Sequence, residues 1–257
     1  MSLNRTILRF PDLPGPYDEA LRQAIDYLDE RFDIAAVAAC GSIVRGTPDA
    51  NSDLDVYVIN RQPFRMRVQR FFSGVPAEIF VNPEFQVRAY LSQEQRAARP
   101  LTAHMLATGF VMYDPDATMA ALRREASALL DEPPAPLPNP TLSRYMIAAI
   151  YEDAMDVIDR DPHTAGLYLH EALWQTLTYI FRAQPAFVPR TKDLLQTLRN
   201  TRPELHELVE DAMDAPDTRT SAELIGRLLD AVIGARGFFE WETEPEALTP
   251  ETDKQRI

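Results

Sequence analysis

Three acidic residues that follow a glycine-serine pair carry the most distinctive chemistry of this sequence. Asp53 and Asp55 stand two apart at the start of a β-rich run, and Glu78 interrupts the apolar run 75–81. Side chains two apart in a strand point to the same face, roughly 6 to 7 Å apart, so the aspartates could bracket one or two divalent metals. Carboxylate oxygens suit Mg²⁺, and two-metal phosphoryl-transfer sites hold their ions about 3.5 to 4 Å apart. Glu78 would complete the ligand set.

Gly41 and Ser42 come directly after residues 34–40, a short apolar run typical of a buried strand. A turn from strand to helix presents backbone N–H groups and a hydroxyl at a helix N-terminus, where an anion is stabilised. Gly46 would let the chain turn tightly without a side-chain clash. This segment is therefore predicted to hold the terminal phosphates of a nucleotide.

Each of these features has a plainer explanation when taken alone. Gly-Ser turns are common, and Ser52 with Asp53 could simply end a loop. Glu78 could face solvent from an edge strand, although a charge inside a buried strand is costly unless it is paired or binds a metal. The combination of all three on successive segments favours a nucleotide and metal site.

The residues Gly41-Ser42, Gly46 and Ser52-Asp53-Leu54-Asp55-Val56 resemble the signature of the polymerase-β-type nucleotidyltransferase superfamily. The resemblance covers residues 34–82. It implies transfer of a nucleoside monophosphate from a nucleoside triphosphate, expected to be ATP, to an acceptor hydroxyl, with pyrophosphate leaving. The implied metal is Mg²⁺, as one or two ions. The expected metal ligands are Asp53, Asp55 and Glu78, and the expected nucleotide-binding residues are Gly41, Ser42, Arg45, Ser52 and Lys192.

The elements that position these residues fall into two parts joined by a connector. Residues 1–130 mix helical and strand patterns, which predicts an α+β nucleotidyltransferase domain with a small mixed sheet. Helices are predicted at 17–32, 86–98 and 117–130, and strands at 34–40, 54–59 and 77–81. Five of the ten residues in 131–140 are proline, so this segment is predicted to be an extended, stiff connector.

Residues 141–257 carry almost no strand signal. Their apolar residues recur at helical spacing between proline-containing breaks, which predicts an all-α helical bundle that binds the acceptor. The predicted helices are 141–159, 164–182, 192–200, 203–214 and 221–239.

This helical half is similar to the C-terminal domains of antibiotic nucleotidyltransferases of the kanamycin and streptomycin types. The similarity places a general base near Glu152, with Asp153 as the alternative, to deprotonate the acceptor hydroxyl. The family's lysine one turn later is replaced by Asp156, and the acidic residues could equally form a solvated face. Segment 189–193 resembles a Ser/Thr-Lys-Asp motif, in which Lys192 would reach the phosphates, or could be an ordinary surface lysine.

Composition narrows the classes of partner. The 39 acidic residues outnumber the 26 basic ones, for a net charge of −13, which argues against nucleic-acid binding and suits a cationic acceptor. No run of about 18 apolar residues predicts a membrane span. The single cysteine, Cys40, cannot form an internal disulfide and favours a reducing, cytoplasmic setting.

The leading hypothesis is therefore a Mg²⁺-dependent nucleotidyltransferase that modifies a small hydroxyl-bearing acceptor. An aminoglycoside-like antibiotic is the most concrete candidate and would imply antibiotic resistance. A second hypothesis keeps the chemistry but makes the acceptor a protein hydroxyl, as in toxin-antitoxin pairs. A third is a non-catalytic, nucleotide-binding regulatory module. The resemblance to the kanamycin type also suggests a homodimer.

Overall fold

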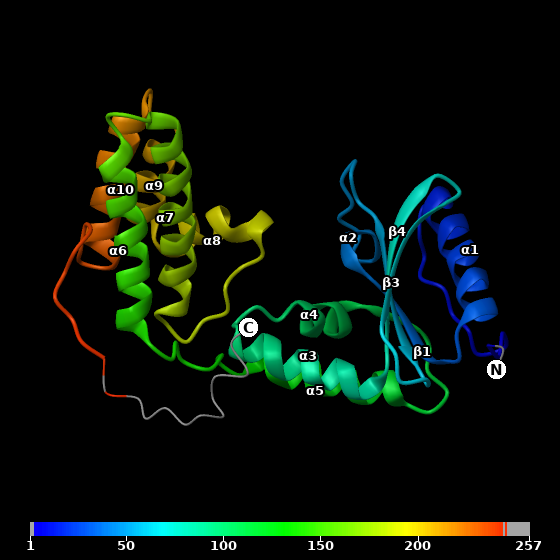
Figure 1. The fold of residues 1–257 in the computed structure, drawn as a ribbon. Coiled ribbons are helices and arrows are strands. Elements are labelled where there is room, and N and C mark those ends of the chain that lie inside the picture. Colours follow the sequence, from blue (N-terminus) through cyan, green and yellow to red (C-terminus); the bar gives the residue numbers. More distant parts are fainter. Residues whose placement is uncertain (1–2, 244, 246–257) are drawn as a thin grey trace. The chain divides into compact units, whose positions relative to one another are not determined.

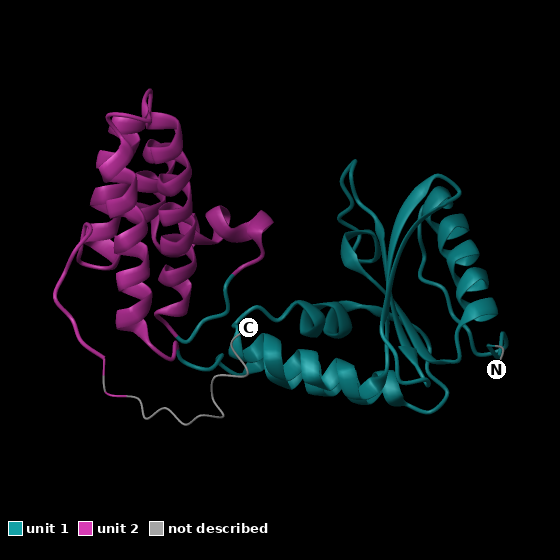
Figure 2. Ribbon diagram, viewed as in Figure 1, with its two compact units in different colours: residues 1–136, 185–188 teal, residues 137–184, 189–257 magenta. Residues whose placement is uncertain are grey.

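The computed structural model describes residues 3–243 and 245, and the chain divides into two compact units (Figures 1 and 2). Unit 1 comprises residues up to 136 together with 185–188, and unit 2 comprises 137–184 and the residues from 189 onward. The chain passes from unit 1 to unit 2 inside the proline-rich segment 131–140. The end of the predicted helical half, residues 244 and 246–257, lies outside the described residues.

Unit 1 is built on a five-stranded mixed sheet. The strands follow the order β3-β4-β2-β1-β5. The neighbours β2 and β4 run parallel, and the other adjacent pairs are antiparallel. The predicted fold class, an α+β domain with a small mixed sheet followed by helices, is confirmed. The strands are β1 (Ile34–Cys40), β2 (Leu54–Asn60), β3 (Met66–Phe72), β4 (Val75–Asn82) and β5 (Phe110–Tyr113).

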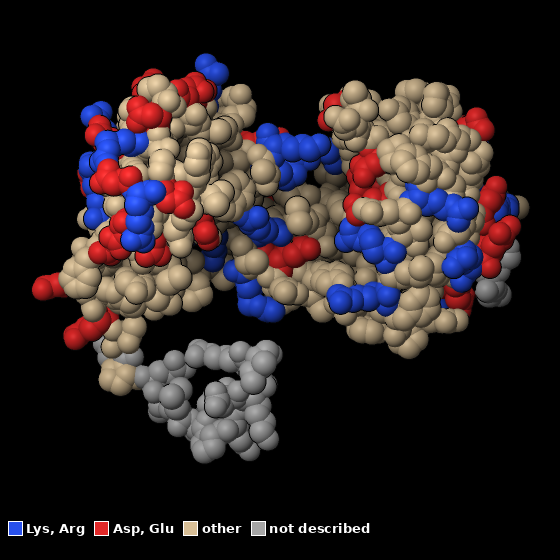
Figure 3. Space-filling view, turned by 45° about the horizontal axis from the view of Figure 1, so that its top comes forward, with Lys and Arg blue, Asp and Glu red and all other residues tan. Residues whose placement is uncertain are grey.

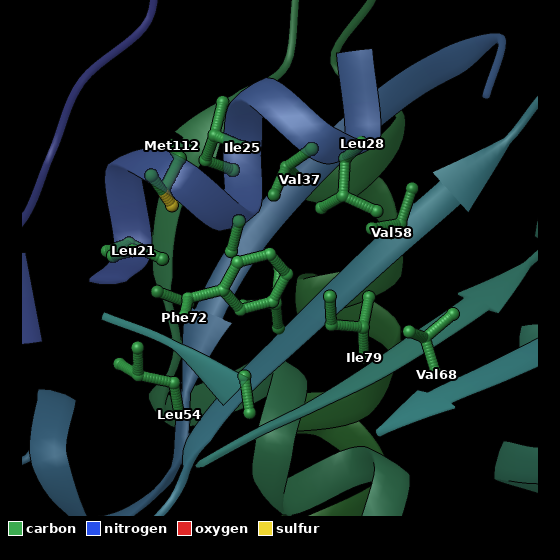
Figure 4. Close-up of a cluster of buried hydrophobic side chains, with 14 of the residues drawn as sticks. Leu21, Ile25, Leu28, Val37, Leu54, Val58, Val68, Phe72, Ile79 and Met112 are labelled. Carbon is green, nitrogen blue, oxygen red and sulfur yellow. The ribbon is translucent and has the colours of Figure 1, made fainter. Parts of the chain in front are cut away.

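Helix α1 (Gly15–Arg31) packs on one face of this sheet. Its residues Leu21, Ile25 and Leu28 recur at helical spacing and are fully buried with even-numbered β2 residues such as Val58 (Figure 4). The odd-numbered β2 residues Tyr57 and Ile59 belong to a second cluster on the opposite face, with three further helices. Those helices are α3 (Glu84–Arg96), α4 (Leu101–Thr108) and α5 (Thr118–Asp131).

The predicted strands and helices of unit 1 omit β3, β5 and α4. Strand β3 lies at the sheet edge and buries only Val68 and Phe72, so exposed polar residues dilute its apolar alternation. It joins β4 through Ser73 and Gly74, whose φ angles of 45° and 80° are both positive. Two such residues form the favoured two-residue connection of a β-hairpin. Strand β5 has only four residues, too few to show a period.

Each helix predicted in unit 2 has a counterpart in the structure. Side chains of Asn139, Asp161 and Asp217 cap the N-termini of three of these helices by accepting a backbone N–H, a role these residue types favour. The predicted helix 192–200 begins as a 3₁₀ turn, Thr191–Asp193, before α8. The helices are α6 (Pro140–Val157), α7 (Pro162–Arg182), α8 (Leu194–Thr201), α9 (Pro203–Met213) and α10 (Thr218–Val232).

The last predicted helix, 221–239, is wrong at its C-terminal end. Helix α10 ends at Val232, and Gly234 adopts a φ of 69°. The Gly234 N–H donates to the Leu229 carbonyl oxygen at 3.0 Å, an arrangement typical of a helix C-terminus.

Within the described part of the chain, no helix combines the length and the apolar character needed to cross a membrane.

Gly109, just before β5, is required for packing rather than for its backbone conformation. Its φ of −69° suits any residue, but an added Cβ would lie 2.8 Å from the Cys40 Sγ and 2.8 Å from the Met105 carbonyl oxygen. We expect Gly109→Ala to lower the free energy of unfolding by about 1 to 3 kcal/mol, because backbone cannot move aside cheaply. Urea denaturation followed by circular dichroism measures this change.

Gly15→Ala is the matched control in the same unit. A Cβ at Gly15 meets nothing within 4 Å, so we expect this change to leave the urea midpoint equal or slightly higher. Equal midpoints for the Gly109 and Gly15 variants would contradict the packing argument.

Candidate metal and nucleotide site

The sheet brings the three predicted acidic residues together. Strands β2 and β4 are parallel neighbours, and Asp55 lies opposite Glu78 in their register. Asp53 lies two residues before Asp55, just ahead of β2. One carboxylate oxygen from each residue lies within 4.8 Å of the others, and all three residues are half-buried. We call Asp53, Asp55 and Glu78 the acidic triad; its oxygen atoms could hold a divalent cation.

Strand order rules out one of the explanations offered for Glu78. Strand β4 lies between β3 and β2, so the explanation of an edge strand that faces solvent is wrong. Successive side chains of a strand alternate between faces, which places Glu78 on the face of the sheet opposite the buried Ile79 and α1. Asp55 occupies this same face.

Gly41 allows the end of β1 to approach Asp55 closely. Its φ is 81°, a left-handed conformation that favours glycine, and an added Cβ would overlap the Asp55 carboxylate. Gly41 is also the first residue of α2 (Gly41–Val44), which follows β1 directly, so the predicted turn from strand to helix is observed. A single helical turn has a small dipole, so an anion bound there would depend on the N–H groups and the Ser42 hydroxyl.

Ser52 holds the loop that connects α2 to β2. Its hydroxyl accepts the Asp49 backbone N–H at 2.8 Å and lies 3.0 Å from the Ser42 hydroxyl. Ser52 is 9% exposed, and its backbone N–H donates to the Asp49 carbonyl at 3.1 Å. The Ser52 hydroxyl is placed to orient the Ser42 hydroxyl, a role that the sequence did not indicate. Direct contact of Ser52 with a nucleotide stays a prediction.

Burial and repulsion within the acidic triad both perturb Asp55. Together they raise the pKa of the Asp55 carboxyl from 3.8 to about 6, with burial as the largest cause and the charges of Asp53 and Glu78 next. Arg45 and Arg67 act in the opposite direction, without cancelling the rise. A divalent cation would relieve this repulsion.

Arg45, predicted to bind phosphates, is exposed next to α2.

Arg67 and Gln69 are site residues that the sequence analysis missed. The Arg67 guanidinium donates to Glu78 Oε1 at 2.6 Å, and the Gln69 amide donates to the same oxygen at 3.1 Å. Both lie on β3, which was not predicted to be a strand. The spacing of two polar residues across one intervening apolar residue, Val68, was the signal available in the sequence.

The other predicted site residues belong to unit 2. Glu152 is exposed on α6, as are Asp153 and Asp156. A Cβ added at Gly237 would lie 3.5 Å from the Glu152 Cβ, so the segment after α10 packs against the base of this side chain. Lys192 is exposed in the 3₁₀ turn Thr191–Asp193. The roles of Glu152 and Lys192 stay predictions.

Charged side chains are intermingled on the molecular surface. On the face shown in Figure 3, Asp and Glu alternate with Lys and Arg over both units. The net charge of −13 is therefore not collected on this face into one acidic patch.

Comparisons with known proteins agree with the site geometry. Residues 21–97 match the family model of the nucleotidyltransferase domain, a range that includes the whole acidic triad. Among solved structures, a nucleotidyltransferase-like protein from Exiguobacterium sibiricum is similar in fold, with 14% sequence identity and a TM-score of 0.52. The similarity covers 84% of this chain and 73% of that chain. A search of curated proteins found no match.

Residues 21–97 therefore form a nucleotidyltransferase domain. This match supports the transferase class and the polymerase-β-type resemblance that the sequence predicted, and the solved structure adds a likeness of fold. The finer resemblance to antibiotic-modifying enzymes is not part of what these comparisons show.

The raised pKa of Asp55 predicts a pH-dependent change in stability. The folded protein binds this proton more tightly than the unfolded chain, so ionisation of Asp55 destabilises the metal-free protein as the pH rises from about 4 through about 6. We expect Asp55→Asn to raise the thermal midpoint in EDTA at pH 7.5, with the gain shrinking toward zero below pH of about 4. Differential scanning calorimetry of both proteins across this range measures the difference.

Addition of Mg²⁺ supplies the second arm of that experiment. At pH 7.5, Mg²⁺ should raise the midpoint of the parent protein and leave Asp55→Asn nearly unchanged, because a ligand that binds only the folded state stabilises it. A midpoint gain that is independent of pH would contradict the assignment of the repulsion to Asp55.

Proposed function

We propose that this protein catalyses Mg²⁺-dependent transfer of a nucleoside monophosphate from a nucleoside triphosphate, ATP in the first instance, to a hydroxyl of a small cationic acceptor. The convergence of three carboxylate oxygens within 4.8 Å of one another carries this proposal. The triad is adjacent to the Gly41-Ser42 turn, whose glycine has no space for a side chain beside Asp55. The groups proposed to bind metal and phosphate therefore lie at the same end of the sheet.

The triad fits Mg²⁺ in the chemistry of its donor atoms. Hard divalent cations prefer carboxylate oxygens, and these three are close enough to share one or two ions. When bound, Mg²⁺ would neutralise charge on the triphosphate and on the leaving pyrophosphate. Ser42, oriented by Ser52, would donate its hydroxyl to a terminal phosphate oxygen. Arg45 would add a guanidinium to the same phosphates.

The acceptor side of the reaction is assigned to unit 2. Its helices would bind the acceptor, and the Glu152 carboxylate would take the proton from the attacking hydroxyl, with Asp153 as the alternative base. Exposure of Glu152 on α6 is compatible with access to an acceptor. Lys192 would contribute a compact positive charge to the phosphates.

The acceptor class follows from charge and resemblance. A net charge of −13 favours encounter with a cationic molecule, and an aminoglycoside is the most concrete such compound with free hydroxyls. Under this proposal the protein would confer antibiotic resistance. The resemblance to the kanamycin type extends the proposal to a homodimer that works in the cytoplasm.

Nucleotide transfer can be tested directly with a matched pair of variants. The purified protein is incubated with labelled ATP, GTP, CTP or UTP, Mg²⁺ and a panel of aminoglycosides, and pyrophosphate release is measured. We expect turnover that Asp53→Asn with Asp55→Asn abolishes, because two of three metal ligands are lost. Asp12→Asn, an exposed acidic residue of the same unit, should retain full turnover.

Further arms separate the competing functions. In one arm, a protein extract is used instead of the aminoglycosides. If label is transferred only to protein, the acceptor is a protein hydroxyl and not a small molecule. If no triphosphate is consumed with any acceptor and none binds in the presence of Mg²⁺, the proposed function is lost.

The general base has its own test. We expect Glu152→Gln to lower kcat by about 10² to 10⁴ and to leave KM for the triphosphate nearly constant, because the amide cannot accept the proton. Glu171→Gln, an exposed glutamate on α7, is the control. If Glu152→Gln keeps a rate within about twofold of the parent and Asp153→Asn loses the activity, the general base is Asp153 and not Glu152.

A further inference from the structure

We propose that Arg67 and Gln69 are positioning residues, which hold one oxygen of Glu78 so that its other oxygen is presented to the metal. This inference rests on the proposed function, since it assigns a role to groups that contact a metal ligand. It places part of the site on β3, the edge strand, which carries none of the acidic triad.

Two donors converge on a single atom of Glu78. Arg67 Nη1 lies 2.6 Å from Oε1, and Gln69 Nε2 lies 3.1 Å from the same oxygen. The antiparallel register places Gln69 opposite Glu78, and Arg67 opposite Phe80, so both donors reach across one pair of strands. Among the hydrogen bonds recorded for residues 3–243 and 245, none ends on Oε2. Under this proposal, Oε2 is the oxygen presented to the cation.

Arg67 is itself fixed by an aromatic stack. Its guanidinium lies 3.9 Å from the centre of the Phe80 ring. The Phe80 ring in turn stacks on the Tyr57 ring, with 5.6 Å between the ring centres and 5° between the ring planes. Tyr57 is buried in the sheet. The Arg67 side chain is 56% exposed, and an exposed ion pair without such a support is weakly ordered. The stack therefore links the orientation of Glu78 to the buried core.

Arginine has the geometry for this double contact, and lysine does not. A planar guanidinium can stack on a ring and donate in its plane to a carboxylate, whereas an ammonium is a point charge on a flexible stem. A positive charge beside a metal site also repels the metal. Substitution by lysine keeps that repulsion and removes the orientation, so Arg67→Lys isolates the positioning effect.

The first measurement is Mn²⁺ binding by electron paramagnetic resonance without nucleotide. We expect Arg67→Lys to bind Mn²⁺ about 10-fold more weakly than the parent, the usual loss when a partner of a metal ligand is removed. The kcat for nucleotide transfer should fall by a similar factor, with KM for the triphosphate within about twofold.

Arg70→Lys is the matched control. Arg70 lies on the same strand but on the opposite face, over the rings of Tyr27 and Phe72. It makes no recorded contact with the triad among the described residues, so we expect parental Mn²⁺ affinity and kcat. Equal Mn²⁺ affinities for Arg67→Lys and Arg70→Lys would overturn the inference.

A double-mutant cycle separates positioning from a general structural effect. If Arg67 acts through Glu78, Arg67→Lys should have no further effect on Mn²⁺ affinity in a Glu78→Gln background. A loss of the same size in both backgrounds would show a structural effect and overturn the inference. If Arg67→Lys fails to fold, Gln69→Leu takes its place, with an expected loss in Mn²⁺ affinity of about fivefold for one hydrogen bond from a neutral amide donor. An unchanged affinity would then be decisive against the inference.

The same titration keeps the two proposals distinguishable. If the parent binds Mn²⁺ no better than Asp55→Asn does, the metal site and the proposed function fail together. If the parent binds Mn²⁺ well and the Arg67 and Gln69 variants bind it equally well, the positioning inference alone fails.

Discussion

Repulsion among three carboxylates is the constraint that the rest of unit 1 has to outweigh. The oxygens of Asp53, Asp55 and Glu78 converge within 4.8 Å, and the pKa of Asp55 rises to about 6 because burial and its two neighbours disfavour its charge. Such an arrangement persists only if other interactions outweigh its cost. The buried clusters on both faces of the sheet supply them, since they fix the parallel register that places Asp55 opposite Glu78.

The surroundings of the triad are built to allow close approach and to fix orientation. Gly41 removes the one Cβ that would overlap the Asp55 carboxylate. Ser52 closes the loop behind Ser42 through the Asp49 N–H. On the far side, Arg67 contacts Glu78 and stacks on Phe80. A glycine beside Asp55, a hydroxyl pair at the neighbouring turn and an arginine on Glu78 thus act on different parts of one site.

The predicted strands and helices agree with the structure where a local sequence pattern identifies them, and differ where the element depends on contacts between distant segments. Strands β1, β2 and β4 are apolar and buried, so their periodicity is legible in the sequence. Strand β3 is exposed at most of its positions because it lies at the sheet edge, and it is joined to β4 by the Ser73-Gly74 turn. The contact of Arg67 with Glu78 could not be predicted without that pairing. Helix α10 ends early because Gly234 closes it, although apolar residues continue beyond.

The sequence by itself determined the chemistry of the site, because residue type and short spacing suffice to identify a Gly-Ser turn followed by paired aspartates. It also determined the change from a mixed sheet to helices, through hydrophobic periods of two and of 3.6. Only the tertiary structure decided which strand lies beside which, and therefore that β4 is internal, that Ser52 supports Ser42 and that Arg67 and Gln69 share one oxygen of Glu78. Strand order and side-chain contact arise from packing between segments far apart in the chain, and no local pattern encodes them.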